Sequence, residues 1–223
     1  VPVLIHTGAP STRESIELTV HARSSGADGA GIVAPYYFPH DDKCLEEHFV
    51  EIARAVPDFP IYLYNIPGNA GNDIKPKVVA AVVKRCSNVA GIKDSSKDLG
   101  RFQDYISVLG SGFTAIVGTD ALVYPALMMG GSGVVSAVAN VFPEHMAALY
   151  DAVVEGDHRK AQELQFFVNK LRDALKIGPY VSPYKKALEY RGFLFGSVRK
   201  PLREMTLEEE AGMKQALHNL GVI

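Results

Sequence analysis

Short apolar segments alternate with amphipathic ones along this chain at a spacing of about 30 residues, and this alternation constrains the fold more than any other feature. Six segments are rich in β-branched residues: Val1–His6, Gly29–Ala34, Pro60–Asn65, Val89–Asp94, Thr114–Gly118 and Gly133–Val138. They are almost continuously apolar, which is typical of parallel strands that are buried on both faces. Six strand–helix units in a row predict a parallel sheet with right-handed crossover connections.

Capping and stop signals indicate helices between these strands. Ser11 and Glu14 form an S-x-x-E capping box, and Gly26 follows as a helix stop. Pro76 suits the first turn of a later helix, and Gly110 ends the one after it. The segments between the strands therefore carry the start and stop signals expected of the helices in βαβ units.

The alternation stops after the sixth strand. Residues 143–177 predict two helices, and Thr206 with Glu209 caps a last one near the C-terminus. We therefore assign residues 1–142 to the strand–helix units, and 143–223 to the helix that follows them and a C-terminal helical extension. No low-complexity or linker-like segment divides the chain.

Two architectures fit a series of βα units. A doubly wound sheet usually carries a glycine-rich phosphate loop after its first strand, and the segment HTGAPST is not of that form. A (β/α)8 barrel needs eight strands, whereas this chain offers six. The pattern favours the barrel without excluding the doubly wound sheet.

Composition and charge exclude several functional classes. The formal net charge of −2 and the absence of basic runs argue against binding to nucleic acid or to a membrane surface. No apolar run is long enough to span a bilayer. The two cysteines, Cys44 and Cys86, form no CxxC motif, so neither a disulfide framework nor a zinc site is expected. The start, VPVLIHTG, lacks the features of a signal peptide, and we expect a cytoplasmic protein.

Lys93 is the most unusual residue at a strand end. It closes the apolar run VAGIK, and the small polar residues DSS follow it. Apolar surroundings disfavour the charged ammonium, and a neutral amine can attack a ketone to form an imine. The alternatives are a lysine that extends into solvent and one that pairs with Asp94.

Tyr64 ends the strand that precedes Lys93. Neighbouring strands lie about 4.8 Å apart, so the two side chains can meet at the carboxyl edge of the sheet. A phenol beside an imine can shuttle protons, although Tyr64 could also be a simple packing residue. Among the seven histidines only His6 stands at a strand end, which makes metal-dependent aldol chemistry a weak alternative. We expect no metal and no cofactor.

Several motifs resemble, in order and spacing, those of the dihydrodipicolinate synthase/N-acetylneuraminate lyase family of pyruvate-dependent class I aldolases. The segments that carry the resemblance are PVLIHTGAPSTRESIELTVHARSSGADG, YLYNIPGNAG, GIKDSS, GTDALVYPALMMGGSGVVSAVANVFPE and KKALEYRGFLFGSVRKPL. The resemblance implies a (β/α)8 barrel with a C-terminal helical extension, of which this chain contains about six strands. It also implies a lyase that forms a lysine Schiff base with pyruvate.

The resemblance assigns roles to individual residues. Lys93 would form the imine with pyruvate or another 2-oxo acid, and Tyr64 would act as the general acid and base. Tyr37 would reach the active site of a neighbouring subunit, so a homo-oligomer, a dimer or a tetramer, is expected. Gly118 and Val135 would line the pyruvate pocket. Thr119 and Asp120, in the same G-T-D segment, are further candidates for substrate binding.

The chain departs from the family pattern in two places. The G-T-T-G-E-like motif of the second strand is absent, and Val1 aligns with the third strand, so we expect the first two βα units to be missing. Asn69 stands where true dihydrodipicolinate synthases carry an arginine. That favours a sugar-acid or related aldehyde as the second substrate. The alternatives are condensation of pyruvate with aspartate semialdehyde, and a non-catalytic 2-oxo-acid-binding or truncated family member.

Overall fold

The computed structural model describes residues 1–110 and 112–223, and these form two compact units. The first, which we call the strand unit, comprises residues 1–119 and 126–134. The second, the helical unit, comprises residues 120–125 and 135–223. No helix in the described part of the chain is long and apolar enough to cross a membrane.

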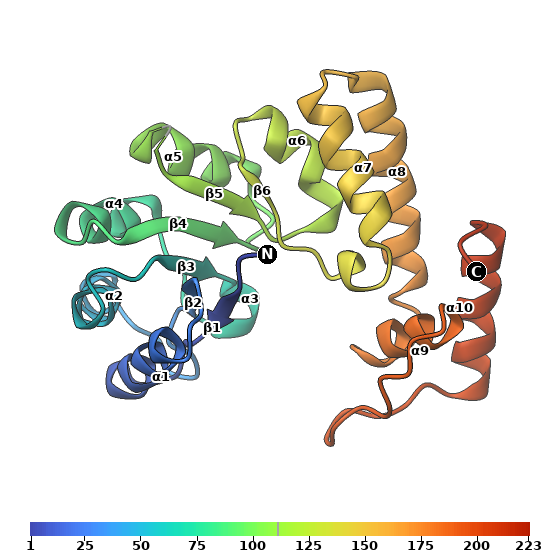
Figure 1. Ribbon diagram of the computed structural model, residues 1–223, viewed down its shortest axis with the longest axis horizontal. Helices are drawn as coiled ribbons and strands as arrows, with labels where there is room; N and C mark the ends of the chain where they lie inside the picture. Colours follow the sequence, from blue (N-terminus) through green and yellow to red (C-terminus); the bar gives the residue numbers. More distant parts are fainter. Residues whose placement is uncertain (111) are drawn as a thin grey trace. The chain divides into compact units, whose positions relative to one another are not determined.

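Within the described residues, the strand unit carries one parallel sheet of six strands in sequence order (Figure 1). The strands are β1 (Leu4–His6), β2 (Gly29–Val33), β3 (Ile61–Asn65), β4 (Val89–Asp94), β5 (Thr114–Val117) and β6 (Gly133–Val134). This confirms the predicted series of βα units. Because neighbours in sequence are neighbours in the sheet, all the carboxyl ends lie along one edge.

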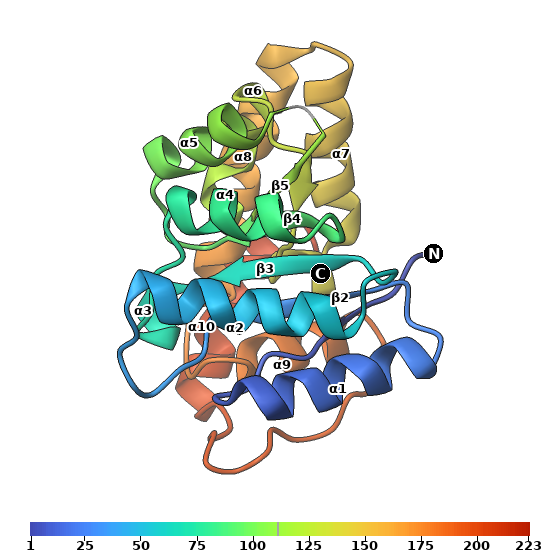
Figure 2. The same cartoon turned by 90° about the vertical axis from the view of Figure 1, so that its left-hand side faces the viewer.

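Helices cover one face of this sheet (Figures 1 and 2). They are α1 (Thr12–Ser24), α2 (Asp42–Ala55), α4 (Pro76–Arg85) and α5 (Leu99–Leu109). Ser11 caps α1 through the Glu14 amide, which is one of the two bonds of the predicted capping box, and Pro76 begins α4 as predicted. The apolar stripe of α2, including Leu45, Phe49 and Ile52, is fully buried. Each such side chain contributes about 1.5–3 kcal/mol to folding.

Burial alternates along the middle strands, which differs from the expectation that both faces are buried. Ile61, Leu63 and Ile92 point to the helix-covered face and are inaccessible, whereas Tyr62 and Tyr64 on the other face are half-buried. We call the second face the open face. Strand residues alternate between faces with a period of two, so the apolar runs conceal two environments that differ in solvent access.

The helical unit contains most of the remaining helices. They are η1 (Asp120–Leu122), the start of α6 (Val123–Met128), η2 (Val138–Asn140), α7 (Pro143–Val154), α8 (His158–Ala174), α9 (Ser182–Tyr190) and α10 (Leu207–Asn219). Thr206 and Glu209 form the predicted reciprocal capping box of α10. Gly156, with φ of +77°, makes the turn between α7 and α8. These features confirm the predicted helical extension.

The sixth strand is shorter than the predicted 133–138, because it ends at Val134. Ser136 instead starts a turn: its hydroxyl accepts a hydrogen bond from the Ala139 amide at 2.9 Å and donates one to Asp120. A side chain that bonds the backbone three residues on competes with strand formation.

Candidate active site

Lys93 and Tyr64 meet on the open face of the sheet. They are register partners on β4 and β3, and Lys93 Nζ lies 3.8 Å from the centroid of the Tyr64 ring. An ammonium over a ring face is attracted by the negative potential of the π system. The structure therefore brings together the two residues on which the sequence interpretation rests.

Gly118 provides the space that Lys93 occupies. A Cβ atom at this position would overlap Ser95 Oγ and would stand 2.8 Å from Lys93 Cε. The Gly118 amide also donates to the Asp94 carbonyl at 2.7 Å, which continues the ladder of β4 and β5 past the last strand pair. A glycine is therefore required here by close approach, without any need for special backbone angles.

His6 is a third residue of this site, noted in the sequence but given no role there. Its ring meets the Tyr64 ring edge-on, with centroids 6.3 Å apart and an interplanar angle of 89°. Partial burial lowers the pKa of His6, and the positive charge of Lys93 lowers it further. On the intervening strand, its register partner is Gly31, which has no side chain. The signal that could have indicated the approach is the place of His6 at the end of its strand, on the same edge of the sheet as Tyr64.

Asp94 does not pair with Lys93, which removes one alternative for the lysine. The two residues are consecutive on β4 and project to opposite faces of the sheet. The Asp94 carboxylate accepts hydrogen bonds from Asn65 Nδ2 at 2.8 Å and Ser96 Oγ at 2.6 Å. Burial raises the pKa of Asp94.

The segment that contains Asn69 forms a short helix, α3 (Pro67–Ala70), closed by Gly71 in the left-handed region. Asn69 is exposed on it. Asn72, in the same loop, is buried and holds the preceding loop, because its Nδ2 donates to the Pro35 and Phe38 carbonyls. Asp73 also bonds within the protein, since it forms an ion pair with Arg101.

Tyr37 lies in an exposed aromatic run. Its side chain is 86% exposed, its φ is +86°, and its ring packs edge-on against Phe38 at 4.8 Å. A non-glycine residue with positive φ is uncommon and is found disproportionately at functional sites. Within the strand unit, the described contacts leave the Tyr37 ring open to solvent.

The remaining candidate residues are divided between the two units. Gly118 and Thr119 are in the strand unit, whereas Asp120 and Val135 are in the helical unit. Val135 is 49% exposed. Asp120 is buried, and its carboxylate accepts from Ser136.

Gln165, which the sequence interpretation missed, holds the segment after Asp120. Its Nε2 donates to the Asp120 carbonyl at 2.8 Å, and its Oε1 accepts from the Tyr124 amide at 2.8 Å. Burial raises the pKa of the Asp120 carboxyl.

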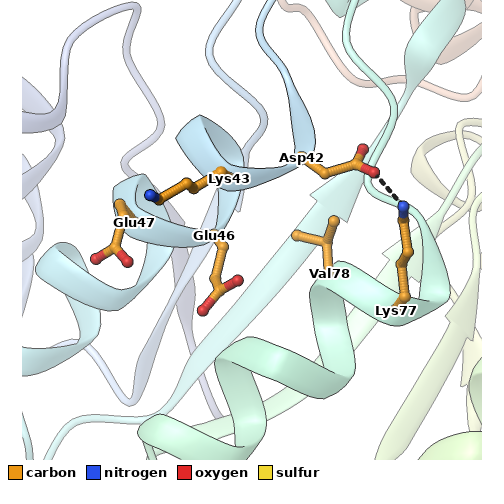
Figure 3. Close-up of a pocket in the computed structure, with 6 residues that line it drawn as sticks. All are labelled: Asp42, Lys43, Glu46, Glu47, Lys77 and Val78. Atoms are coloured by element: carbon orange, nitrogen blue, oxygen red, sulfur yellow. Dashed lines mark ion pairs between the residues drawn. The ribbon is translucent and has the colours of Figure 1, made fainter.

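A surface cavity of about 430 Å³ lies between α2 and α4 (Figure 3). None of Lys93, Tyr64 and His6 lines it. Its charges are largely paired: Lys77 with Asp42 at 2.6 Å, and Arg85 with Glu46 and Glu47 at 2.6 Å each. It therefore has little to offer a charged ligand. In residues 1–110 and 112–223 no group of three or more His, Cys, Asp or Glu side chains is arranged to hold a metal ion.

Comparison with known proteins gives consistent matches over the whole chain. The sequence profile of the dihydrodipicolinate synthetase family matches residues 1–220. An uncharacterized DapA-like lyase of Halobacterium salinarum is 42% identical over 226 residues, which cover 100% of this chain and 72% of that protein. The 4-hydroxy-tetrahydrodipicolinate synthase of Syntrophus aciditrophicus is 40% identical over 100% of this chain and 76% of its own length.

A solved structure agrees with these sequences. YagE, a prophage protein of the dihydrodipicolinic acid synthase family from Escherichia coli K12, was solved in complex with pyruvate. It superimposes with a TM-score of 0.94 at 31% identity, over 100% of this chain and 76% of that structure. The predicted barrel fold, with six of its strands in this chain, is confirmed.

Proposed function

Since this chain belongs to the dihydrodipicolinate synthetase family, we propose that it makes or cleaves a carbon–carbon bond through an imine between Lys93 and a 2-oxo acid. Membership confirms the predicted class, a lyase of the class I aldolase type. The observation that carries the assignment to Lys93 is its Nζ, 3.8 Å above the Tyr64 ring at the carboxyl edge of the sheet.

The proposed reaction begins when the Lys93 ammonium gives up a proton, which leaves a neutral amine. The amine adds to the ketone carbon of pyruvate; the carbonyl oxygen takes one proton from the amine nitrogen and a second from an acid, and leaves as water to give the iminium. The iminium draws electrons from C3, which loses a proton and becomes a nucleophilic enamine carbon. That carbon attacks the aldehyde, whose oxygen takes a proton, and water then releases the product from Lys93. We propose that the Tyr64 hydroxyl transfers these protons.

The proposal for assembly is a homo-oligomer in which Tyr37 completes the site of a neighbouring subunit. It is supported by the exposure of the aromatic run Tyr36–Phe38, whose members are 41%, 86% and 66% exposed. Aromatic residues are enriched in subunit interfaces, and a dimer, or a tetramer built from two dimers, would bury this run. Solution scattering of a fully active sample tests it: activity in a monomer would contradict the shared site.

We propose a hydroxyaldehyde as the partner of the 2-oxo acid. Asn69 is exposed on α3, the helix that follows the carboxyl end of β3, and it can donate to and accept from hydroxyl groups but cannot bind a carboxylate in the bidentate manner of arginine. Aspartate semialdehyde is the second candidate, favoured by the relative in Syntrophus aciditrophicus that carries the synthase name. We place the reaction in the cytoplasm, where the two free cysteines would remain reduced.

Exchange of the methyl protons of pyruvate for deuterium tests whether the chain forms an enamine at all. The proposal predicts exchange that depends on enzyme concentration and stops in a Lys93→Arg variant. Measurable binding of pyruvate without exchange would instead identify a 2-oxo-acid-binding protein that does not catalyse.

A further inference from the structure

Asn65 and Asp94 directly follow the proposed reacting pair in sequence. They are register partners at the last pair of β3 and β4, one residue after Tyr64 and Lys93. Both side chains project into the helix-covered face, where they are 0% and 3% exposed. Asn65 Nδ2 donates to Asp94 Oδ1 at 2.8 Å, so a side-chain hydrogen bond joins the two strands where their pairing ends.

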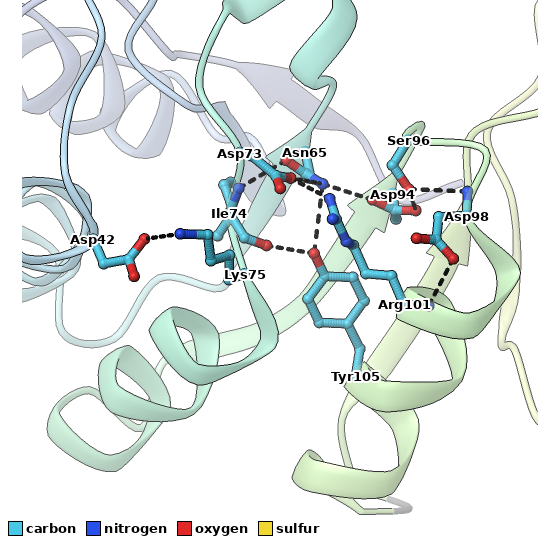
Figure 4. A network of polar contacts seen from close by, with 10 residues as sticks. All are labelled: Asp42, Asn65, Asp73, Ile74, Lys75, Asp94, Ser96, Asp98, Arg101 and Tyr105. Atoms are coloured by element: carbon cyan, nitrogen blue, oxygen red, sulfur yellow. Dashed lines mark hydrogen bonds and ion pairs between the residues drawn. The ribbon is translucent and has the colours of Figure 1, made fainter.

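Further contacts fix this bond from several sides (Figure 4). Asn65 Oδ1 accepts from the Ile74 amide at 2.9 Å, and Asn65 Nδ2 also lies 3.2 Å from Asp73 Oδ1. Tyr105 of α5 donates to the Ile74 carbonyl, and Arg101 of α5 pairs with Asp73. The network therefore connects β3, β4, α5 and the segment before α4.

The free side of the Asp94 carboxylate is also occupied. Ser96 Oγ donates to Asp94 Oδ2 at 2.6 Å. The backbone strengthens the same place, since the Ser95 amide donates to the Asn65 carbonyl at 2.8 Å. With both carboxylate oxygens bonded and the Asn65 amide bonded at both ends, neither side chain can rotate without breaking a buried hydrogen bond, which costs more than an exposed one.

We propose that the Asn65–Asp94 hydrogen bond positions Lys93 over the ring of Tyr64. The proposal rests on the proposed function for its catalytic consequence, but not for its geometry. Successive strand residues share a backbone and project to opposite faces, so a tie between residues 65 and 94 on one face sets the separation of residues 64 and 93 on the other. Asn65 and Asp94 act through the backbone and do not touch the substrate.

A matched pair of variants separates geometry from charge. Asp94→Asn removes the charge but can still accept from Asn65 and donate to Ser96, whereas Asp94→Ala removes both bonds. Asn88→Ala is the control, because Asn88 Nδ2 donates to the Ala53, Val56 and Phe59 carbonyls at the opposite end of β4. It breaks a comparable set of side-chain bonds far from the strand end.

The first readout does not depend on activity. In protein labelled with ¹³Cε-lysine, the ε-methylene signal of Lys93, assigned with Lys93→Arg, should be shifted upfield by the Tyr64 ring. We expect the shift to persist in Asp94→Asn and Asn88→Ala and to collapse in Asp94→Ala. No upfield signal in the unmodified chain, or a shift that survives in folded Asp94→Ala, would overturn the proposal. If Asp94→Ala does not fold, Ser96→Ala, which removes one of the two bonds, should weaken the shift.

The second readout is the rate of pyruvate proton exchange per active site, with sites counted as chains that borohydride can trap with pyruvate. Asp94→Ala should lower kcat by about tenfold or more while KM changes less, since misplaced groups lose rate. Asp94→Asn should stay within about threefold and Asn88→Ala should not differ. Equal damage in Asp94→Asn and Asp94→Ala would show that charge, not position, matters. Absence of any trapped adduct in the unmodified chain would contradict the proposed function alone, because the spectral readout still decides the positioning role.

Discussion

The two faces of the sheet meet at the ends of β3 and β4 with different chemistry. On the open face, Tyr64 and Lys93 are half-buried, and the lysine contacts a ring instead of an acid. On the helix-covered face, Asn65 and Asp94 are buried and bonded to each other. In each of the two paired dipeptides, Tyr64-Asn65 on β3 and Lys93-Asp94 on β4, one residue is thus suited to reaction and the other to support, because strand residues alternate between faces.

This difference separates what substitutions should do. On the open face, polar groups keep access to a small molecule, and their loss should change rate more than stability. On the helix-covered face, the side chains of Asn65 and Asp94 are hydrogen-bonded within the protein, and the loss of such a group should change the free energy of unfolding. The predictions below test that separation, from the largest expected effect to the smallest.

Tyr64→Phe removes a hydroxyl from the open face and keeps the ring under Lys93. We expect pyruvate proton exchange to fall by about 10²–10⁴-fold, the usual contribution of a general acid or base. The melting temperature should hardly change, because the ring packing is retained. Tyr62→Phe, two residues earlier on the same face of β3, is the control and should keep the rate of pyruvate proton exchange. A fully active Tyr64→Phe enzyme would contradict the proton-carrying role.

Protonation of His48, on α2 among the helices that cover the sheet, should affect stability and not rate. Burial lowers its pKa from 6.5 to about 4, its Nδ1 lies 2.9 Å from Thr12 Oγ1, and its Nε2 has no partner among the described residues. The unfolded chain therefore binds a proton at His48 below about pH 6.5, and the folded chain only below about pH 4. Stability is full above pH 6.5 and falls as pH drops through this window, by up to about 3 kcal/mol.

Denaturant unfolding at several pH values, compared with His48→Gln, measures this term. The variant can keep a hydrogen bond to Thr12 but does not titrate, so its stability should depend less on pH between 6.5 and 4. Parallel curves for the two proteins would contradict the assignment.

Gly118→Ala should disturb the open face by steric contact. The added methyl group would press against Ser95 Oγ and Lys93 Cε, so the lysine must move from the Tyr64 ring. We expect exchange to fall by up to about 100-fold, the cost of a displacement on the order of 1 Å. Gly31→Ala is the matched control, because a Cβ at Gly31 meets nothing within 4 Å. Equal rates for the two variants would show that Lys93 tolerates displacement.

Asn69→Ala should have the smallest effect, confined to the choice of aldehyde. Loss of about one neutral hydrogen bond, roughly 1 kcal/mol, should reduce the specificity constant for a hydroxyaldehyde several-fold and leave pyruvate exchange unaltered. A panel of aldehydes assayed with pyruvate measures it. If aspartate semialdehyde is the best substrate, the preference inferred from Asn69 is wrong.

The sequence was sufficient for the parts of the structure that depend on local signals. Ser11, Pro76 and the Thr206–Glu209 box begin helices as predicted, and the six parallel strands follow in order. Lys93 and Tyr64 could be paired in advance because the adjacent strand ends of a parallel sheet share an edge.

Other features depend on tertiary contacts that no local pattern reports. Asn72 reads as a polar loop residue, but it is buried because its amide satisfies carbonyls more than 30 residues away. Ser136 reads as the end of a strand, but its bond to Asp120 favours a turn. The supporting role proposed for Asn65 and Asp94 could have been predicted from the sequence, since the period of two already places them on the face of the sheet opposite to Tyr64 and Lys93.

Borohydride reduction in the presence of pyruvate, followed by peptide mass analysis, tests the central claim most directly. An imine at Lys93 predicts that the peptide containing Lys93 gains the mass of one reduced pyruvyl group, that a competing 2-oxo acid lowers the yield of this adduct, and that Lys93→Arg abolishes it. Lys97, exposed on the loop just after β4, is an internal control that should remain unmodified. An adduct on another lysine, or none on a folded and pyruvate-binding preparation, would contradict the account.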